Sequence, residues 1–109
     1  LSDANLRGAK LTDADCYDAR FFGADCEGAD FERASLRGAD FKGANLRSAI
    51  LKGTALSADN LGHAAEVQDA DLTDAILEGA AWSGAEYNRN TKFPQRFKPE
   101  AHGMVLVNE

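Results

Sequence analysis

Two cysteines and two histidines are the side chains of this 109-residue chain that could support redox chemistry, nucleophilic catalysis or metal binding. Cys16 and Cys26 are too few for a disulfide framework and lack the spacing of a zinc site. His63 and His102 lie 39 residues apart, without the close pairing that places two ligands on one helical turn. Asp59 with His63 could hold a cation weakly, although a solvated loop histidine is the favoured interpretation. No serine elbow or glycine-rich phosphate loop is present, so the sequence predicts no enzyme, no metal site and no cofactor.

Composition sets the class of protein that must position these residues. The chain is long enough for one domain, and its formal net charge of -6 disfavours binding to nucleic acid or to an anionic membrane. No apolar run approaches the ~20 residues of a membrane span. No charged start leads into an apolar stretch, so no signal peptide is expected. A single globular domain with a basic or neutral partner is the resulting expectation.

The sequence repeats every five residues, and a large side chain marks each repeat. Alanine stands two residues before 15 of the 17 marked positions, and eight of the ten glycines stand two residues after one. We refer to these three places as the central position, the alanine slot and the turn slot. The central positions are Leu6, Leu11, Cys16, Phe21, Cys26, Phe31, Leu36, Phe41, Leu46, Leu51, Leu56, Leu61, Val67, Leu72, Leu77, Trp82 and Tyr87.

Neither a helix nor a straight strand can bury residues at this period. Five residues advance an α-helix by about 500°, and an odd step places strand residues on alternate faces. The chain must therefore turn once per repeat, and glycine in the turn slot supplies the dihedral angles for that turn. The sequence predicts an all-β solenoid.

Four repeats per coil are favoured by the residue types. A coil of that size aligns the aromatic residues Phe21, Phe41 and Trp82, with Leu61 between them. The array then holds about four and a half coils and stands ~22 Å tall at the usual strand spacing. Neighbouring strands also favour opposite charges, and the same coil size predicts a column of alternating charge at Arg7, Glu27 and Arg47.

The array is expected to occupy residues 1–88, with residues 89–109 as a carboxyl-terminal cap. The frame shifts by one residue within 57–66, which predicts a bulge or short loop there. Phe93, Phe97 and residues 104–107 are suitable covering groups, and residues 99–102 could form one helical turn. The amino-terminal end needs cover from upstream residues or from a second copy, so a homodimer through a solenoid end is possible.

The tandem A(D/N)LxG pattern, as in ANLRG and ADFKG, resembles the pentapeptide-repeat family. The resemblance covers residues 1–88 and implies a right-handed quadrilateral β-helix with four repeats per coil. It implies no catalytic residues, and the tail TKFPQRFKPEAHG is similar to a segment common in cyanobacterial members. The pattern departs from the family at Cys16, Cys26, Ile50, Glu66 and Ile76.

The two cysteines occupy central positions half a coil apart. Opposite walls of a filled core should hold their Cα atoms beyond the ~7 Å limit for a disulfide. Buried free thiols are therefore expected for Cys16 and Cys26, with a redox switch as the alternative. Unbonded thiols favour a reducing compartment such as the cytoplasm.

Charge is distributed unevenly along the array. Residues 1–52 carry nine acidic and eight basic side chains, whereas residues 53–88 carry seven acidic side chains and no basic one. The basic tail residues at 89–98 are expected to fold back on these acidic coils, and a basic partner surface is the alternative. The seven acids are Asp59, Glu66, Asp69, Asp71, Asp74, Glu78 and Glu86.

Several outward positions carry apolar groups that a solenoid does not need. Tyr17 and Phe22 flank one corner, and Ile50, Ala55 and Ile76 should cluster on adjoining walls. Exposed apolar groups often mark contact sites. Tyr17 and Phe22 are therefore candidate binding residues together with the seven acids.

These observations predict a non-catalytic interaction scaffold for an unidentified protein with a basic surface. One alternative, implied by the resemblance, is a DNA mimic that inhibits a topoisomerase or gyrase. Over ~22 Å, duplex DNA carries about 13 charges, more than this array offers. The other alternative is a regulatory or positioning domain of a larger protein such as a kinase.

Overall fold

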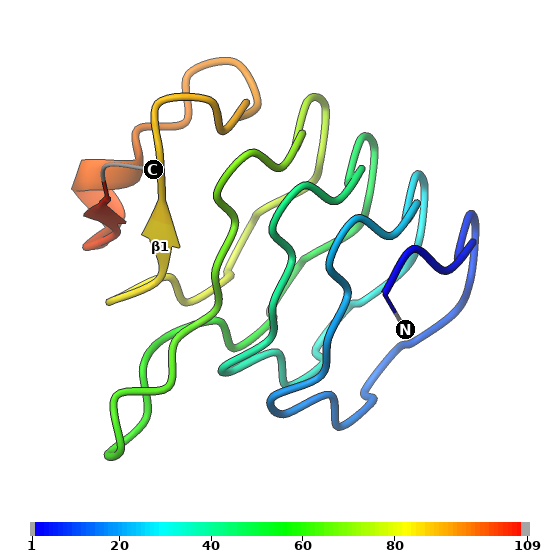
Figure 1. The fold of residues 1–109 in the computed structure, drawn as a ribbon, viewed down its shortest axis with the longest axis horizontal. Coiled ribbons are helices and arrows are strands. Elements are labelled where there is room, and N and C mark those ends of the chain that lie inside the picture. The colour runs from blue at the N-terminus through cyan, green and yellow to red at the C-terminus, as the bar shows by residue number, and fades with distance from the viewer. Residues whose placement is uncertain (1, 108–109) are drawn as a thin grey trace.

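The computed structural model describes residues 2–107, which wind into a stack of square coils (Figure 1). Parallel bridges join residues twenty positions apart, as in Asn5 with Asp25, and Lys10 with Asp30. One coil therefore contains four repeats. The five-residue period, the all-β architecture and the coil size predicted from the sequence agree with this solenoid.

Regular secondary structure is short because the chain turns after each bridging residue. The described residues contain β1 (Glu86–Tyr87), the 3-10 helix η1 (Pro99–His102) and β2 (Val105–Leu106). All other ladder contacts in this part of the chain are isolated parallel bridges. No helix within residues 2–107 is long and apolar enough to cross a membrane.

The coils share four walls, which we number in chain order by their inward central residues. Backbone bonds such as Cys26 N–H to Asn45 C=O at 2.7 Å connect each coil to the next along a wall. The ladder assigns Leu6, Cys26, Leu46 and Leu72 to wall 1; Leu11, Phe31, Leu51 and Leu77 to wall 2; Cys16, Leu36, Leu56 and Trp82 to wall 3; and Phe21, Phe41, Val67 and Tyr87 to wall 4.

Each corner is a tight turn closed by one backbone hydrogen bond. The Ala9 N–H donates to the Leu6 carbonyl at 3.0 Å, and Gly8 in the turn slot has a φ of 66°. Asp13 and Asp18 take the same left-handed conformation with φ of 60° and 57°. Aspartate tolerates this region better than most residues, so the turn slot does not require glycine.

The aspartate or asparagine before the central residue also has a structural role. Asp40 Oδ1 accepts a hydrogen bond from the Lys42 N–H at 2.9 Å, and Asn45 Oδ1 accepts one from the Arg47 N–H at 3.1 Å. These bonds satisfy an outward amide beside the turn, as in other Asx turns. Either residue serves equally, which explains the A(D/N)LxG pattern.

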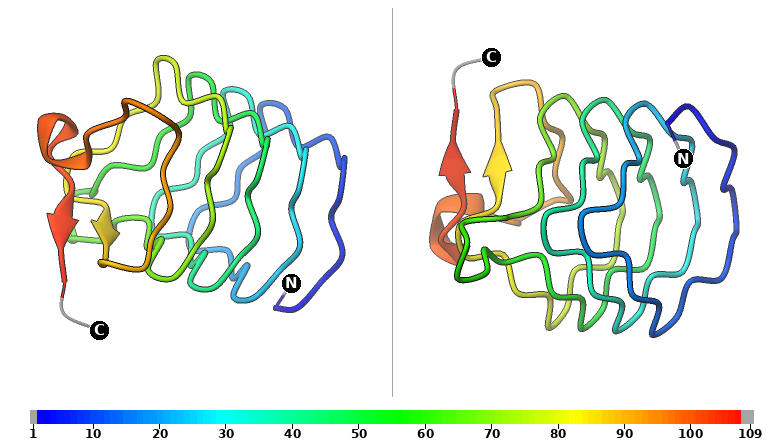
Figure 2. Two further views of the ribbon diagram at one scale, coloured as in Figure 1. Left: turned by 90° about the horizontal axis from the view of Figure 1, so that it is seen from above. Right: turned by 60° about the horizontal axis from the view of Figure 1, so that its bottom comes forward.

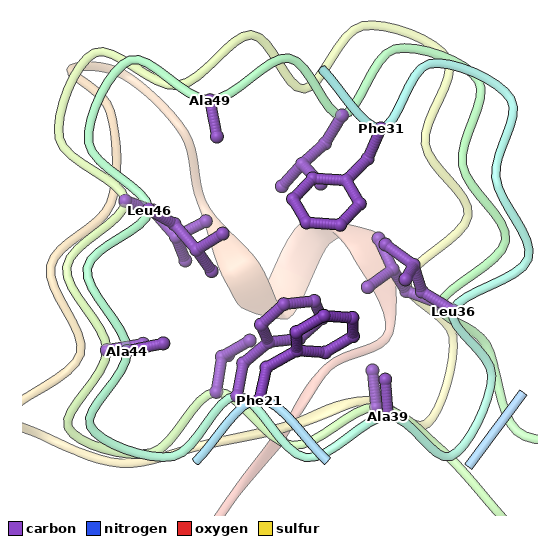
Figure 3. Packing of buried hydrophobic residues seen from close by; sticks show 14 of the residues in the cluster. Phe21, Phe31, Leu36, Ala39, Ala44, Leu46 and Ala49 are labelled. Atoms are coloured by element: carbon purple, nitrogen blue, oxygen red, sulfur yellow. The ribbon is translucent and has the colours of Figure 1, made fainter. Parts of the chain in front are cut away.

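Stacked aromatic rings fill the middle of the core (Figure 3). The Phe21 and Phe41 rings are parallel with centroids 4.7 Å apart, and Phe31 meets both edge-on at 5.8 Å. The predicted alignment of Phe21 with Phe41 is confirmed. The predicted place of Trp82 is wrong, because Trp82 lies on wall 3 beyond Leu56.

A six-residue insertion explains that error. Ladder partners are twenty residues apart up to Ser35 with Ala55, but Asp40 pairs with Glu66, twenty-six residues away. Residues 59–64 therefore form an inserted loop at the corner between walls 3 and 4, visible as the long green projection in Figure 1. Six residues are one more than a five-residue repeat, so the insertion appears in the sequence as a frame shift of one residue. Leu61, predicted to be central, is 76% exposed in the loop.

The tail covers the last coil. β2 pairs in parallel with β1 and extends the ladder of wall 4 (Figure 2). Phe97 contacts Trp82 with ring centroids 5.9 Å apart, and Met104 is buried. The predicted helical turn at 99–102 is confirmed as η1. Of the covering run at 104–107, Val105 and Leu106 are about half exposed, so they do not act as buried cover.

Both cysteines are free thiols, as predicted, but the predicted burial holds only for Cys26. Cys26 is buried on wall 1, and Cys16 is half-buried on wall 3 in the first coil. Burial raises the pKa of the Cys26 thiol to about 11 and also raises that of Cys16. The reactive thiolate is therefore disfavoured at both positions.

Candidate interaction surface

The predicted acidic residues do not share one surface. Glu66 and Glu86 form a backbone β-bridge on wall 4, whereas Asp71 forms its β-bridges with Asn45 and Lys92 on wall 1. Asp69 and Asp74 occupy turn slots with φ of 61° and 62°. Glu78 follows the central residue of wall 2, and Asp59 lies in the inserted loop, so the acidic coils present several small groups rather than one acidic wall.

Two of these acids are engaged in structural contacts. The Asn88 and Asn90 side-chain amides each donate to Asp69 Oδ1 at 3.0 Å, and these bonds lower the pKa of Asp69. Partial burial opposes ionisation of Asp71, but the hydrogen bonds from Thr73 and the charges of Arg47 and Lys92 together outweigh it and lower the pKa of Asp71. Asp69 and Asp71 therefore stabilise the last coil.

The basic tail lies partly against the acidic coils. The backbones of Lys92 and Asp71 form a parallel β-bridge on wall 1, and the positive charge of Lys92 contributes to the lowered pKa of the Asp71 carboxyl. Arg47 of the preceding coil approaches Asp71 at 3.7 Å. The expectation that the tail folds back on the acidic coils therefore holds at Lys92.

Wall 4 carries an outward row of charges that changes sign once. The bridges run from Arg20 to Asp40, from Asp40 to Glu66, and from Glu66 to Glu86. Two adjoining hollows of about 240 and 430 Å³ lie beside this row and share Asp18, Gly38 and Glu66 in their linings. We call this feature the wall 4 groove; His63 from the inserted loop lines its outer side.

Ionic contacts within the groove leave it acidic overall. Lys42 reaches Glu66 at 3.8 Å, and the Gln68 amide donates to Glu86 at 3.2 Å. Asp40 Oδ1 accepts the turn bond from the Lys42 N–H, and Asp18 Oδ2 lies 3.6 Å from His63 Nδ1. A cationic ligand group is the type that this lining would attract.

A side-chain cluster joins the inserted loop to the first coil. The Tyr17 hydroxyl donates a short hydrogen bond to Asp59 and lies 2.8 Å from His63 Nδ1. The hydrogen bond to Asp59 raises the pKa of Tyr17 to about 12, and the same bond lowers the pKa of Asp59 to about 2. Within residues 2–107, no three such acidic, histidine or cysteine side chains converge as metal ligands.

The sequence identified Tyr17 and Asp59 separately but did not pair them. Their contact depends on the direction in which the inserted loop folds, and periodicity carries no information about that direction. Asp18 and Asp40 were also missed as groove residues, because the wall 4 register is known only once the insertion is counted as six. The exposed apolar candidates form two groups. Phe22 lies on wall 4, whereas Ile50 and Ile76 form a parallel bridge on wall 2, with Ala55 on the adjoining wall 3, as expected.

The coil geometry defines a β-solenoid of five-residue repeats, and comparison with known proteins agrees. A family model for pentapeptide repeats matches residues 1–38 and 24–58 with eight copies. The chain belongs to the pentapeptide-repeat family. No curated protein matches it at a significant level.

Solved structures of cyanobacterial pentapeptide-repeat proteins are similar to this chain. The protein alr5209 from Nostoc PCC 7120 is 30% identical with a TM-score of 0.66, covering 94% of this chain and 84% of its own. Rfr23 from Cyanothece 51142 is 26% identical with a TM-score of 0.44, covering 77% and 63%. QnrB1, a plasmid-mediated fluoroquinolone resistance protein, is 20% identical with a TM-score of 0.43, covering 98% and 64%.

Proposed function

We propose that this chain is a non-catalytic scaffold that binds a basic segment of a partner protein in the wall 4 groove. The supporting observation is the row Asp40, Glu66 and Glu86, which runs beside Asp18 along two hollows. Successive coils lie about 4.8 Å apart, so these carboxylates form a continuous acidic strip. The right-handed quadrilateral β-helix implied by the family would hold this strip on a flat, rigid wall.

Charge complementarity gives such a groove its selectivity. Opposite charges raise the rate of encounter and discriminate against acidic partners more than they add to affinity. The partner would therefore carry several lysine or arginine residues in an extended segment, and binding should weaken with added salt.

A labelled octalysine peptide tests the proposal by fluorescence anisotropy at low and high salt. The variant Asp40→Asn with Glu66→Gln and Glu86→Gln removes three charges, keeps side-chain size and retains the turn acceptor at position 40. We expect roughly tenfold weaker binding at low salt. Circular dichroism should be unchanged.

A matched variant removes the same number of charges from the opposite wall. Asp30→Asn, Glu32→Gln and Glu78→Gln lie on wall 2 and reduce the net negative charge by the same amount. Binding should change little in this variant. Equal loss in both variants would show that the peptide responds to net charge alone, which would contradict a site in the groove.

The DNA-mimic alternative requires a continuous acidic surface. On walls 1 and 2 basic groups interrupt the acids, as in Arg7 with Asp25 at 2.6 Å and Arg33 with Asp13 at 2.8 Å. Three consecutive acids on wall 4 are fewer than the charges of duplex DNA of the same length. The scaffold is therefore the better supported function, and gyrase inhibition at micromolar protein in a supercoiling assay would reverse that order.

The amino-terminal end of the solenoid is a second proposed contact. Leu6 and Leu11 are half-buried there, whereas Phe31 and Leu46 one or two coils later are buried. A second copy covering this end would form a homodimer, which light scattering would detect as a doubled mass that Leu11→Lys abolishes.

The free thiols support a cytoplasmic location, which cell fractionation would test.

A further inference from the structure

The inserted loop is held in place by side chains rather than by the ladder. Among the described residues, its backbone bonds stay within the loop: Asp59 N–H to His63 C=O at 3.2 Å, and Gly62 N–H to Asp59 C=O at 3.0 Å. Ladder bonds resume on either side, at Ala58 with Ser83 and at Glu66 with Ala39. The position of the loop relative to the coils therefore depends on other contacts.

One carboxylate organises the loop and connects it to the first coil. Asp59 Oδ1 accepts from the Leu61 N–H at 2.8 Å and from the His63 N–H at 2.9 Å. Asp59 Oδ2 accepts from the Tyr17 hydroxyl. The same side chain thus closes the loop internally and attaches it to wall 3, forty-two residues earlier in sequence.

The hydroxyl of Tyr17 has one proton, and that proton fixes the role of His63. Because the proton is donated to Asp59, the 2.8 Å contact with His63 requires the Nδ1 atom to donate to the Tyr17 oxygen. His63 therefore carries its hydrogen on Nδ1. Asp18 Oδ2 at 3.6 Å and Asp59 Oδ2 at 3.7 Å flank this nitrogen.

The coil beneath the loop leaves room for this contact. Gly38 occupies the turn slot between Asp18 and the loop, with a φ of 72°. A Cβ atom there would lie 1.9 Å from Asp18 Oδ1 and 3.3 Å from the His63 Cβ. A side chain at position 38 would force Asp18 and His63 to move apart.

We propose that residues 59–64 form a strap and that Tyr17 is the positioning residue that fastens it to the first coil. Releasing the hydroxyl would detach the strap and remove His63 from the outer side of the wall 4 groove. This inference does not depend on the proposed function, because the fastening exists whether or not the groove binds a partner.

Amide hydrogen exchange tests the strap directly. Tyr17→Phe removes only the hydroxyl, and exchange at Leu61 and His63 should accelerate about tenfold through local opening. Exchange at Leu36 and Leu46 should stay unchanged. Tyr87→Phe is the matched control, since it removes the hydroxyl of an inward-facing tyrosine of β1. Unchanged exchange at Leu61 and His63 in Tyr17→Phe would overturn the proposal.

Nitrogen chemical shifts of His63 provide a readout that general destabilisation would not move. The native protein should show hydrogen on Nδ1, and Tyr17→Phe should abolish that preference. A native signal for Nε2–H with a bare Nδ1 would also overturn the proposal. Octalysine binding is then measured on Tyr17→Phe. A changed affinity in Tyr17→Phe would show that the strap affects the groove. An affinity that falls only in the variant with Asp40→Asn, Glu66→Gln and Glu86→Gln would support the proposed function and leave the strap without a role in binding.

Discussion

The coils and the inserted loop are stabilised in different ways. Each coil makes backbone bonds to its neighbours on four walls and fills its interior with buried side chains such as Phe21 and Leu36. The loop at residues 59–64 makes no described backbone bond to a neighbouring coil and has no buried core side chain. It is positioned by contacts among Tyr17, Asp59 and His63. The coils should therefore respond to changes in packing and register, and the loop to single polar atoms.

The largest effect is expected in the aromatic core of the coils. Phe41 is fully buried between stacked and edge-on rings, so Phe41→Ala should lower the free energy of unfolding by about 3–5 kcal/mol. Phe22, which is 51% exposed on the same wall, is the control. Urea denaturation measures both, and similar losses at the two positions would contradict the proposed core.

Deleting the loop tests whether the coils need it. Removing residues 59–64 joins Ala58 to Ala65 and restores an uninterrupted five-residue frame; Ala58→Gly suits the new turn slot. Because loop length affects stability only weakly, we expect a change within about 1 kcal/mol. Circular dichroism and urea denaturation check this expectation.

Deleting only residues 59–63 is the matched comparison. This deletion leaves one extra residue, so the next coil must bulge or reverse its inward and outward positions. We expect a larger loss of about 2–4 kcal/mol. If the two deletions were equally stable, the register would not depend on the five-residue period.

The contrast between the two regions also explains what the sequence could predict. The positions of Phe21, Phe41 and Leu46 follow from the period, because each repeat must turn its large residue inward. Leu61 obeyed the same spacing, yet a five-residue step inside a loop is indistinguishable from one inside a coil. The misassignment of Trp82 followed directly, since every wall after the insertion moved by one corner.

The candidate site was less predictable for a related reason. Tyr17 and Asp59 were recognised as unusual from their outward position and charge. Their contact bridges coils that are not adjacent in sequence, and it depends on the path of an aperiodic segment. Periodicity could not have predicted it, whereas the residue types of the tail, such as Pro99 at the start of a helical turn, did predict η1 and the covering role of Phe97.

A smaller effect is expected beneath the loop, at Gly38. Gly38→Ala and Gly43→Ala place a Cβ at similar φ values of 72° and 70°, so each should lose about 1 kcal/mol from backbone strain. Only the Gly38 Cβ meets Asp18 and His63. Hydrogen exchange at His63 should therefore accelerate further in Gly38→Ala, and equal loop exchange in both variants would argue against close contact there.

The smallest change concerns protons at the fastening itself. The raised pKa of Tyr17, about 12, means that its stabilising contribution is complete below pH 10.0 and is lost as the pH rises through about 12. The lowered pKa of Asp59, about 2, gives a contribution that is present above pH 3.8 and is lost as the pH falls through about 2. Loop exchange, corrected for intrinsic rates, should therefore be insensitive to these two groups between those limits.

Asp59→Asn separates the two contributions. The amide keeps an oxygen acceptor for Tyr17 but removes the negative charge and weakens the bond, so the pKa of Tyr17 should fall toward its ordinary value of 10.0. Carbon chemical shifts of labelled tyrosine, followed against pH, measure this change. A Tyr17 titration that is identical in native protein and Asp59→Asn would show that the hydroxyl does not bond to Asp59, and the loop would then need another point of attachment to the coils.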